Sequence, residues 1–277
     1  MKNKRKILLA LVLMAVPTVW AYAQDRPPAP EIQNILNRKK LIVALHSIDQ
    51  PPFFFVGKNN QLMGLDVDLA RGMAESLGVD VEFNRKAKVF NDLVDIVDRG
   101  EADLAISKLS RTLKRAEIIN YSTPYIVFRQ ALLVNRLELA KKAPSTEDIA
   151  PFIRDFTGKL GVIANSSYIN YARKNFPRAT IVELSTWDDV VDAVFSGEVL
   201  AGYRDEMEIK KIIKSRDDAA LKVKSVVIKD EKDHIAIAVK REHLQLLYWI
   251  NQYLETQDLN LTAEVLLDKY PQIFADK

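Results

Sequence analysis

The stretch ADLAISKLSRTLKRAEIINYSTPY, residues 102–125, decides how the rest of the chain is organised. Its first five residues are an apolar run typical of a buried strand, and LKRAEII (113–119) shows a short helical pattern. Lys108, Ser110 and Arg115 therefore follow a strand at its junction with a helix, where backbone N–H groups favour negative charge. The pattern predicts an anion site, whereas a solvated basic turn is the alternative for such a run taken alone.

Strands and helices alternate before this stretch and again after it. Before it, the patterns predict strands at 41–46 and 79–83 and helices at 66–77 and 90–98. After it, they predict strands at 158–164, 180–184 and 199–203 and helices at 167–175 and 187–195. Each βαβαβ order predicts a mostly parallel sheet with helices on its faces, which is an α/β fold.

The two halves also repeat a local pattern. FNDLVDIVDRGE (90–101) and WDDVVDAVFSGE (187–198) share an aromatic residue, two aspartates, two valines and a terminal Gly-Glu at matching positions. Chance similarity between two amphipathic helices is the alternative, but the matching turn favours two related lobes. We expect strands that cross between these lobes at 128–135 and 234–240, and helices that serve packing at 244–254 and 261–267.

The ends of the chain predict export and set the lobe boundaries. Residues 1–23 combine a basic start, a short apolar run and small residues near Ala23, which is typical of a signal peptide cleaved after Ala23. An uncleaved membrane anchor is the alternative, but the apolar run is short and Pro17 interrupts it. We expect a leader at 24–37, lobe 1 at 38–131 and 234–277, and lobe 2 at 132–233.

Composition excludes several classes of function. The first 23 residues hold four of the 40 basic residues and none of the acidic ones, so the remainder has 36 basic against 37 acidic residues. This near-neutral charge gives no support to nucleic-acid binding. The chain has no cysteine, hence no disulfide or thiol nucleophile, and its three histidines lack the spacing of a zinc site. We expect neither a metal nor a cofactor.

Polar groups follow four of the predicted strands. In open α/β sheets, ligands bind beyond the carboxyl ends of the strands, and in two-lobed proteins they bind between the lobes. The four loops offer Asp49, Gln50, Phe53 and Phe54; Lys108, Ser110 and Arg115; Asn165, Ser166 and Ser167; and Arg204, Asp205 and Glu206. Together they supply a cation for a carboxylate, hydroxyls, an apolar wall and an anion for an ammonium, which are the groups that an α-amino acid needs.

The sequence resembles the type II periplasmic solute-binding proteins of the amino-acid family over roughly residues 41–270. The resemblance is carried by PPFFFV (51–56), GLDVDLARGMAESLG (64–78), residues 100–125, LGVIANSSY (160–168) and AGYRDE (201–206). It implies a two-lobed type II fold with a ligand cleft between lobes that two hinge strands join. It also implies a periplasmic, monomeric receptor that closes on an amino acid or related carboxylate and delivers it to a membrane permease or sensor.

The resemblance carries ligand-binding roles over to residues at matching positions. Arg115 would clamp the ligand's α-carboxylate with a bidentate fork that lysine cannot reproduce, and Ser110 would bind the same carboxylate. Asp205 would pair with the ligand's α-ammonium, with a solvated turn carboxylate as the alternative. Ser166 and Ser167 would contact the ligand's carboxylate or side chain from the same lobe as Asp205.

Aromatic residues and departures from the family's pattern bear on the ligand. Phe90 would wall the ligand's side-chain pocket, with Phe53 nearby, although core packing is the alternative for both rings. Gln50 replaces an aromatic residue, Lys108 a small residue and Asn165 a glycine. Lys108 either enters the cleft, where an added cation favours a ligand with an extra carboxylate, or lies on the surface. We predict a preference for acidic or polar ligands over arginine or lysine.

Two other functions remain open on the same scaffold. Some proteins of this family resemble dehydratases that act on carboxylated rings, and such an enzyme needs a general acid or base in the cleft. Asp205, Glu206 and Lys108 are the candidates for that role, but no pair has a diagnostic spacing. A ligand-sensing module without transport is the other possibility, and the sequence does not separate it from a transport receptor.

Overall fold

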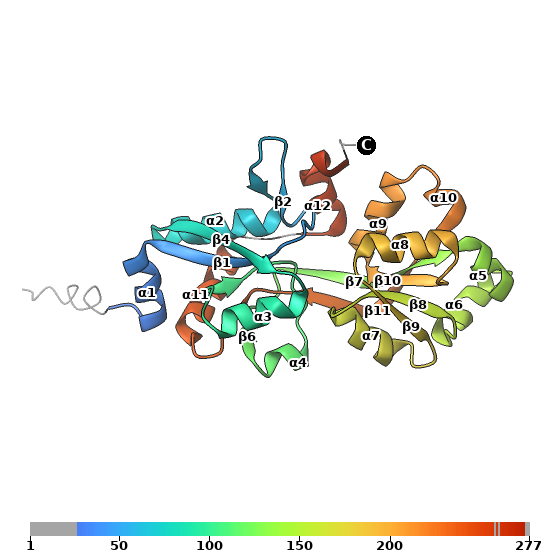
Figure 1. Cartoon of the computed structure of the whole chain (residues 1–277), viewed down its shortest axis with the longest axis horizontal. Helices are drawn as coiled ribbons and strands as arrows, with labels where there is room; N and C mark the ends of the chain where they lie inside the picture. The colour runs from blue at the N-terminus through green and yellow to red at the C-terminus, as the bar shows by residue number, and fades with distance from the viewer. Residues whose placement is uncertain (1–26, 258, 260, 275–277) are drawn as a thin grey trace, which may run out of the picture.

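The computed structural model describes residues 27–257, 259 and 261–274, and shows two α/β lobes side by side (Figure 1). The first lobe contains the helices α1 (Pro30–Arg38), α2 (Leu65–Leu77), α3 (Phe90–Asp98), α4 (Leu113–Ala116), α11 (Leu244–Thr256) and α12 (Ala263–Lys269), followed by a 3₁₀ turn at Pro271–Phe274. Its strands are β1 (Lys40–His46), β2 (Phe55–Val56), β3 (Leu62–Met63), β4 (Asp80–Ala87), β5 (Leu104–Ala105), β6 (Ile119–Tyr121) and β12 (Ala238–Lys240).

The second lobe is built from the central part of the chain. Its helices are α5 (Arg136–Lys142), α6 (Thr146–Arg154), α7 (Ser167–Asn175), α8 (Trp187–Ser196), α9 (Glu206–Ser215) and α10 (Ala219–Lys222). Its strands are β7 (Ile126–Asn135), β8 (Lys159–Ile163), β9 (Thr180–Leu184), β10 (Ala201–Asp205) and β11 (Val223–Ile235).

Each lobe has one five-stranded mixed sheet with helices on both faces. The strand order is β4-β1-β5-β12-β6 in the first lobe and β11-β7-β10-β8-β9 in the second. β1 is parallel to β4 and β5, whereas β12 is antiparallel to its neighbours. Along β1, Val43 packs into the core under α2 and Ala44 into the core under α3, because neighbouring side chains of a strand point to opposite faces. The expected two-lobed α/β fold is confirmed.

The repeated sequence pattern gives the two lobes the same helix entry and exit. Asp92 accepts a hydrogen bond from the Val89 N–H before α3, and Asp189 accepts one from the Thr186 N–H before α8. Gly100 (φ 71°) and Gly197 (φ 80°) follow the two helices in the left-handed region, which glycine enters without steric cost. The matching residues therefore stabilise matching turns.

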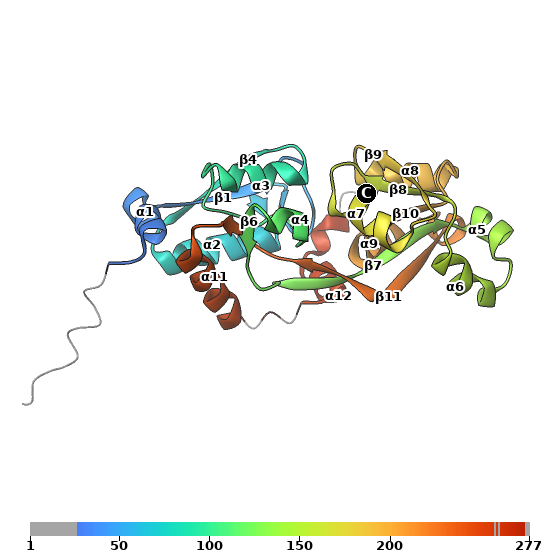
Figure 2. The same cartoon turned by 90° about the horizontal axis from the view of Figure 1, so that it is seen from below.

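Two long antiparallel strands join the lobes (Figure 2). β11 pairs with β7 from Val223↔Asn135 to Ile235↔Ile126, with a register shift between Ile228 and Lys232. The prediction of 234–240 as the return crossing is therefore wrong in its bounds. The crossing ends at Ile235, and β12 lies within the sheet of the first lobe, between β5 and β6.

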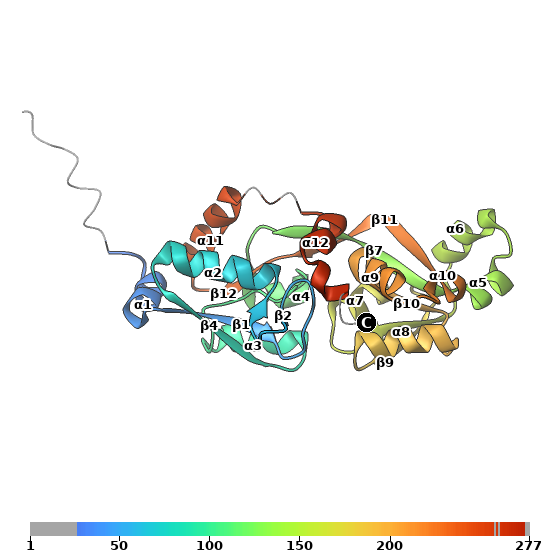
Figure 3. The ribbon, with the colours of Figure 1, turned by 90° about the horizontal axis from the view of Figure 1, so that it is seen from above.

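The two ends of the described chain pack on the first lobe. Residues 30–37, expected as part of a leader, belong to α1, because Ile32 and Ile35 are buried in the core of the first lobe. α12 buries Leu266 and Leu267 in the same core and lies beside α9 of the second lobe, where Lys210 forms an ion pair with Glu264 (Figure 3). Within the described residues, no helix has the length and apolarity needed to cross a membrane.

Candidate functional site

A buried pocket lies between the lobes, at the carboxyl ends of β5, β8 and β10. Its lining residues are Phe90, Lys108, Ser110, Arg115, Ser166, Ser167, Tyr168, Arg204, Asp205 and Asp233. Seven of the eight predicted site residues are therefore brought together. The free space is about 10 Å³, roughly room for one water molecule, so the protein's own side chains fill the centre of the cleft.

A larger opening of about 310 Å³ adjoins this pocket and shares Phe90 with it. Both lobes contribute to its walls, with Gln50 from the first and Ile163, Trp187 and Ile212 from the second. The opening therefore provides free space between the two lobes, next to the filled pocket.

The loop after β5 forms the wall of the pocket on the first lobe. Lys108 has a left-handed backbone (φ 46°), which is uncommon for a residue with a side chain. Its N–H donates to Oδ2 of the buried Asp66 at 2.7 Å, and the His46 N–H donates to Oγ of Ser107 at 2.9 Å. These two bonds hold the loop in a shape that directs the side chain of Lys108 into the cleft.

Asp66 stabilises this loop from inside the lobe. The carboxyl group accepts from the Tyr125 hydroxyl through Oδ1 at 2.8 Å and from the Lys108 N–H through Oδ2 at 2.7 Å. Burial raises the pKa of Asp66 to about 7, although hydrogen bonds from the Tyr125 hydroxyl and the Lys108 N–H act in the opposite direction. The anchor of the Lys108 loop therefore changes its protonation state near neutral pH.

We expect this titration to lower stability as the pH rises. Between the ordinary pKa of 3.8 and about 7, Asp66 is ionised in the unfolded chain but protonated in the folded protein, so the free energy of unfolding falls across that range. Asp66→Asn copies the neutral carboxyl and should weaken the dependence, raising stability at pH 8 relative to the wild type. Urea midpoints at pH 5 and pH 8 measure the effect, with the exposed Asp80→Asn as the control. If the urea midpoint changed by the same amount between pH 5 and pH 8 in Asp66→Asn and in the wild type, the prediction would be contradicted.

Arg115 is held in place by hydrogen bonds from its guanidinium. Nη1 donates to the carbonyl oxygen of Ser110 at 3.0 Å, and Nε donates to Oδ1 of Asn91 at 3.1 Å. The Ser110 hydroxyl donates to Oδ2 of Asp233 at 3.0 Å. These bonds to the protein's own groups fix the buried guanidinium plane, which favours bidentate binding of a carboxylate.

The second lobe presents the start of α7. Ser166 and Ser167 are buried there, and the Ser166 hydroxyl donates to the carbonyl oxygen of Ile163 at 2.7 Å. Asn165 has a left-handed backbone (φ 55°). Asparagine tolerates this region better than most residues, so the turn forms without a glycine.

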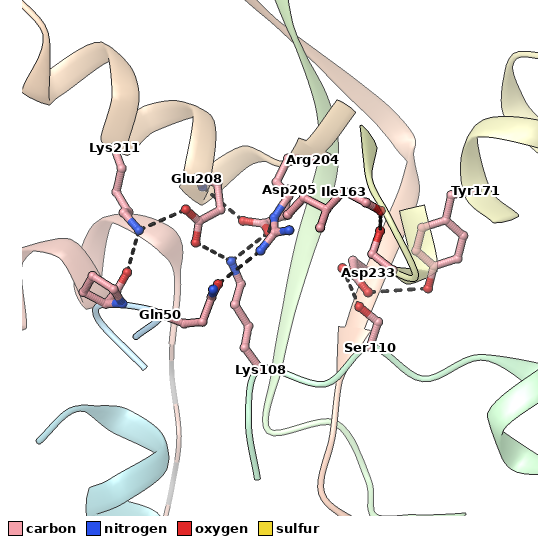
Figure 4. Close-up of polar contacts among 12 residues, drawn as sticks. Gln50, Lys108, Ser110, Ile163, Tyr171, Arg204, Asp205, Glu208, Lys211 and Asp233 are labelled. Atoms are coloured by element: carbon pink, nitrogen blue, oxygen red, sulfur yellow. Dashed lines mark hydrogen bonds and ion pairs between the residues drawn. The ribbon is translucent and has the colours of Figure 1, made fainter. Parts of the chain in front are cut away.

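Lys108 crosses the cleft and binds two carboxylates of the second lobe (Figure 4). Its Nζ lies 2.8 Å from Oδ2 of Asp205 and 2.6 Å from Oε1 of Glu208, and all three side chains are at most 4% exposed. Burial alone would raise the pKa of Glu208, but the charges of Lys108 and Lys211 outweigh it and lower that pKa. Lys108 therefore lies in the cleft, paired with the carboxylate that the resemblance assigns to an α-ammonium.

Phe53 lies outside the pocket, unlike the other predicted residues. Its ring is fully buried in the core of the first lobe, edge-on to Phe128 at 6.0 Å between ring centres. Nζ of Lys108 lies 5.1 Å from the centre of the Phe53 ring. Phe53 thus packs behind Lys108, which corresponds to the core-packing alternative.

Four pocket or near-pocket residues were not predicted as site residues: Tyr168, Arg204, Asp233 and Glu208. Arg204 is surrounded by the rings of Phe90, Tyr168 and Trp187, each about 6 Å from its guanidinium carbon. Its position at the end of a predicted strand was a usable signal. Glu208 lies one turn into α9, which Asp205 caps. Asp233 is part of a charged run whose sequence indicates a solvated edge, and only the strand crossing buries it.

The carboxyl group of Asp233 is enclosed by hydroxyls. Besides Ser110, the Tyr171 hydroxyl lies 3.5 Å from Oδ1 of Asp233. Burial raises the pKa of Asp233 to about 6, and the charge of Asp205 adds to this effect.

No group of three or more metal-binding side chains occurs in the part of the chain that the structure covers.

Comparison with known proteins finds amino-acid-binding proteins that are similar to this chain in sequence and in structure. The chain is 22% identical over 231 residues to the ABC transporter arginine-binding protein 1 of Escherichia coli K12, covering 82% of this chain and 89% of that protein. The structure is similar to AbpA of Streptococcus pneumoniae, an amino acid ABC transporter substrate-binding protein bound to L-arginine. The TM-score is 0.71 at 25% sequence identity, and the match covers 88% of this chain and 100% of that chain.

A reconstructed protein is also similar in structure. It is the ancestral amino acid-binding protein AncCDT-1, a precursor of cyclohexadienyl dehydratase. The TM-score is 0.68 at 26% sequence identity, and the match covers 86% of this chain and 98% of that chain. The family model for bacterial extracellular solute-binding proteins, family 3, matches residues 42–272. With both lobes, the hinge strands and the interlobe pocket inside that match, the chain belongs to the bacterial extracellular solute-binding proteins of family 3.

Proposed function

We propose that this protein is an exported receptor that captures a small carboxylate-bearing ligand by hinge closure, for an ABC-type uptake system. The observation that carries the proposal is the interlobe pocket with Arg115 held rigid on one wall and Arg204 buried on the other. Because the walls belong to different lobes joined by β7 and β11, bending of these strands opens and closes the site. Ligand binding is the whole activity, with no bond made or broken.

The ligand class is acidic or polar amino acids or related carboxylates, in preference to arginine and lysine. Lys108, Arg115 and Arg204 give the pocket three cations, against the carboxylates of Asp205 and Asp233. Two of the similar proteins named above bind arginine, whose guanidinium needs an uncompensated anion. Here Asp205 already has Lys108 as its partner at 2.8 Å.

A dehydratase-like enzyme on this scaffold is less well supported. The similarity to AncCDT-1 motivates it, but two of the three candidate acid–base groups, Asp205 and Lys108, neutralise each other. The third, Glu206, accepts from the Arg129 N–H and from Lys210, away from the pocket. We therefore propose a binding protein and not an enzyme.

Export and assembly belong to the same proposal. The signal peptide at 1–23 lies outside the described residues, and its cleavage after Ala23 places the mature protein in the periplasm. We propose that the receptor acts as a monomer, with a membrane permease as its partner. A sensor partner instead of a permease is the alternative, and the two share the same ligand-binding step.

A thermal-shift screen tests the ligand class. We expect acidic or polar amino acids or small carboxylates to raise the melting temperature, since a ligand that binds only the folded state stabilises it above its dissociation constant. Arginine and lysine should give no shift at the same concentration. Calorimetric titration that shows tight binding to cationic amino acids alone would refute the proposal.

A further inference from the structure

The acceptor site for a ligand's ammonium is already filled by the protein itself. Asp205 and Glu208 have four carboxylate oxygens, and each has a donor or cation. Oδ1 of Asp205 accepts from the Glu208 N–H at 3.1 Å, and Oδ2 lies 2.8 Å from Nζ of Lys108. Oε1 of Glu208 lies 2.6 Å from Lys108 and Oε2 lies 2.9 Å from Nζ of Lys211.

An α-ammonium would have to displace Lys108 from this position. The side chain of Lys108 is 2% exposed and lies over the rings of Phe53 and Phe128. Separated from Asp205 and Glu208, the lysine would be an uncompensated buried charge, which is a costly arrangement. The ε-ammonium of Lys108 therefore occupies the part of the site that a ligand ammonium would need.

Three buried side-chain atoms at the pocket and the adjoining opening make no hydrogen bond to the described residues, and each can donate one: Nε of Arg204, Nε1 of Trp187 and the Tyr168 hydroxyl. Nε of Arg204 is buried and makes no hydrogen bond to the residues that the structure describes, although Oδ2 of Asp205 lies 3.7 Å away. Nε1 of Trp187, on the wall of the adjoining opening, is also buried without a hydrogen-bond partner among those residues. Buried donors normally have partners, so these atoms indicate that an acceptor-rich group completes the site.

We propose that Lys108 substitutes for the ligand's α-ammonium, so that this receptor selects small organic carboxylates that lack an α-amino group. This inference rests on the proposed receptor function and narrows its ligand class. The carboxylate binds Arg115 and Arg204 between the lobes, and the rest of the ligand extends toward the opening beside Phe90. Lys108 is a specificity-determining residue, because it neutralises Asp205 and Glu208 without contribution from the ligand.

Matched pairs of ligands test the inference by calorimetric titration of the full-length mature protein. Each pair differs only by the α-ammonium: glutarate and L-glutamate, succinate and L-aspartate, 3-phenylpropanoate and L-phenylalanine, and 4-methylpentanoate and L-leucine. In the pair that binds best, we expect the amino-free acid to bind at least about tenfold more tightly. Equal or tighter binding of the amino acid in that pair overturns the inference.

Substitutions at Lys108 should change this ratio. Lys108→Gly suits the left-handed backbone and removes the lysine from Oδ2 of Asp205 and Oε1 of Glu208, so it should shift the ratio toward the amino acid by at least about tenfold. Lys108→Met keeps the bulk and should shift the ratio in the same direction by a smaller factor. The cost of lobe closure is common to both ligands of a pair, so it cancels in the ratio. Lys114→Ala, at an exposed cation of the same segment, is the control and should leave the ratio unchanged.

The outcomes separate this inference from the proposed function. If the amino acid binds more tightly and Asp233→Asn removes that advantage, the ammonium binds Asp233 and the inference is wrong while the receptor function stands. If the ratio is unchanged in both Lys108 variants, the inference is also wrong while the receptor function stands. If arginine or lysine binds tightly and no member of the four pairs binds, the proposed ligand class fails and the inference fails with it. Absence of binding by every compound counts against both.

Discussion

Arg115→Ala is expected to reduce affinity for the best carboxylate ligand by roughly 30-fold to several thousand-fold. Truncation of one partner in a buried, hydrogen-bonded charge pair costs about 2–5 kcal/mol, and about 1.4 kcal/mol corresponds to a factor of ten. Arg115 meets the conditions for a large effect, because its guanidinium is buried and fixed by Ser110 and Asn91. Calorimetric titration with the ligand found by thermal shift measures the loss.

Two further variants show whether charge or geometry matters at this position. Arg115→Lys keeps the charge but loses the planar fork, so it should also bind the ligand much more weakly than the wild type. Lys114→Ala removes an exposed cation that pairs with Glu117 and should leave affinity unchanged. Wild-type affinity in Arg115→Ala would show that the carboxylate binds elsewhere.

Asp205→Asn is expected to shift the ligand-free protein toward an open arrangement of its lobes. Breaking a buried ion pair by removal of one partner costs about 3–5 kcal/mol, and Lys108 keeps Glu208, so we expect the lower end of that range. Asparagine still accepts the Glu208 N–H at the start of α9, since it is a good N-cap residue. The change therefore acts on the contact between the lobes and not on the helix.

Small-angle X-ray scattering measures this shift as an increase in the radius of gyration without ligand. Asp189→Asn is a matched control, because Asp189 stabilises the start of α8 in the same lobe but does not line the interlobe pocket. It should leave the radius unchanged. The same radius for Asp205→Asn and the wild type would show that the ion pair between Lys108 and Asp205 does not hold the lobes together.

Much of the fold could be predicted because its signals are local. The helices α3 and α7 and the strand β9 have the predicted bounds, since apolar spacing and capping residues act within a few positions. The bounds of the return crossing could not be predicted, because pairing with β7 places residues 223–235 in one strand, and that pairing is not local. The same applies to α1, whose isoleucines find their core only after the lobe folds.

Some residues of the candidate site could likewise be predicted from the sequence, whereas others could not. Arg115, Ser110, Ser166, Ser167 and Asp205 were found from their position after strands, since the carboxyl ends of neighbouring strands meet at one edge of a sheet. Glu208 and Asp233 were missed because their sequence neighbours are charged and indicate a solvated surface. Their burial depends on contact with the other lobe and with the crossing strand.

The sequence by itself determined that the chain forms two α/β lobes and that an arginine and a set of hydroxyls follow their strands. It left open whether Lys108 lies on the surface or enters the cleft. Only the tertiary structure decided this, because Asp66 directs the loop inward and Asp205 and Glu208 meet the ammonium from the other lobe. A buried charge needs partners from several segments, and the assembled lobes bring together residues about 100 positions apart in the chain.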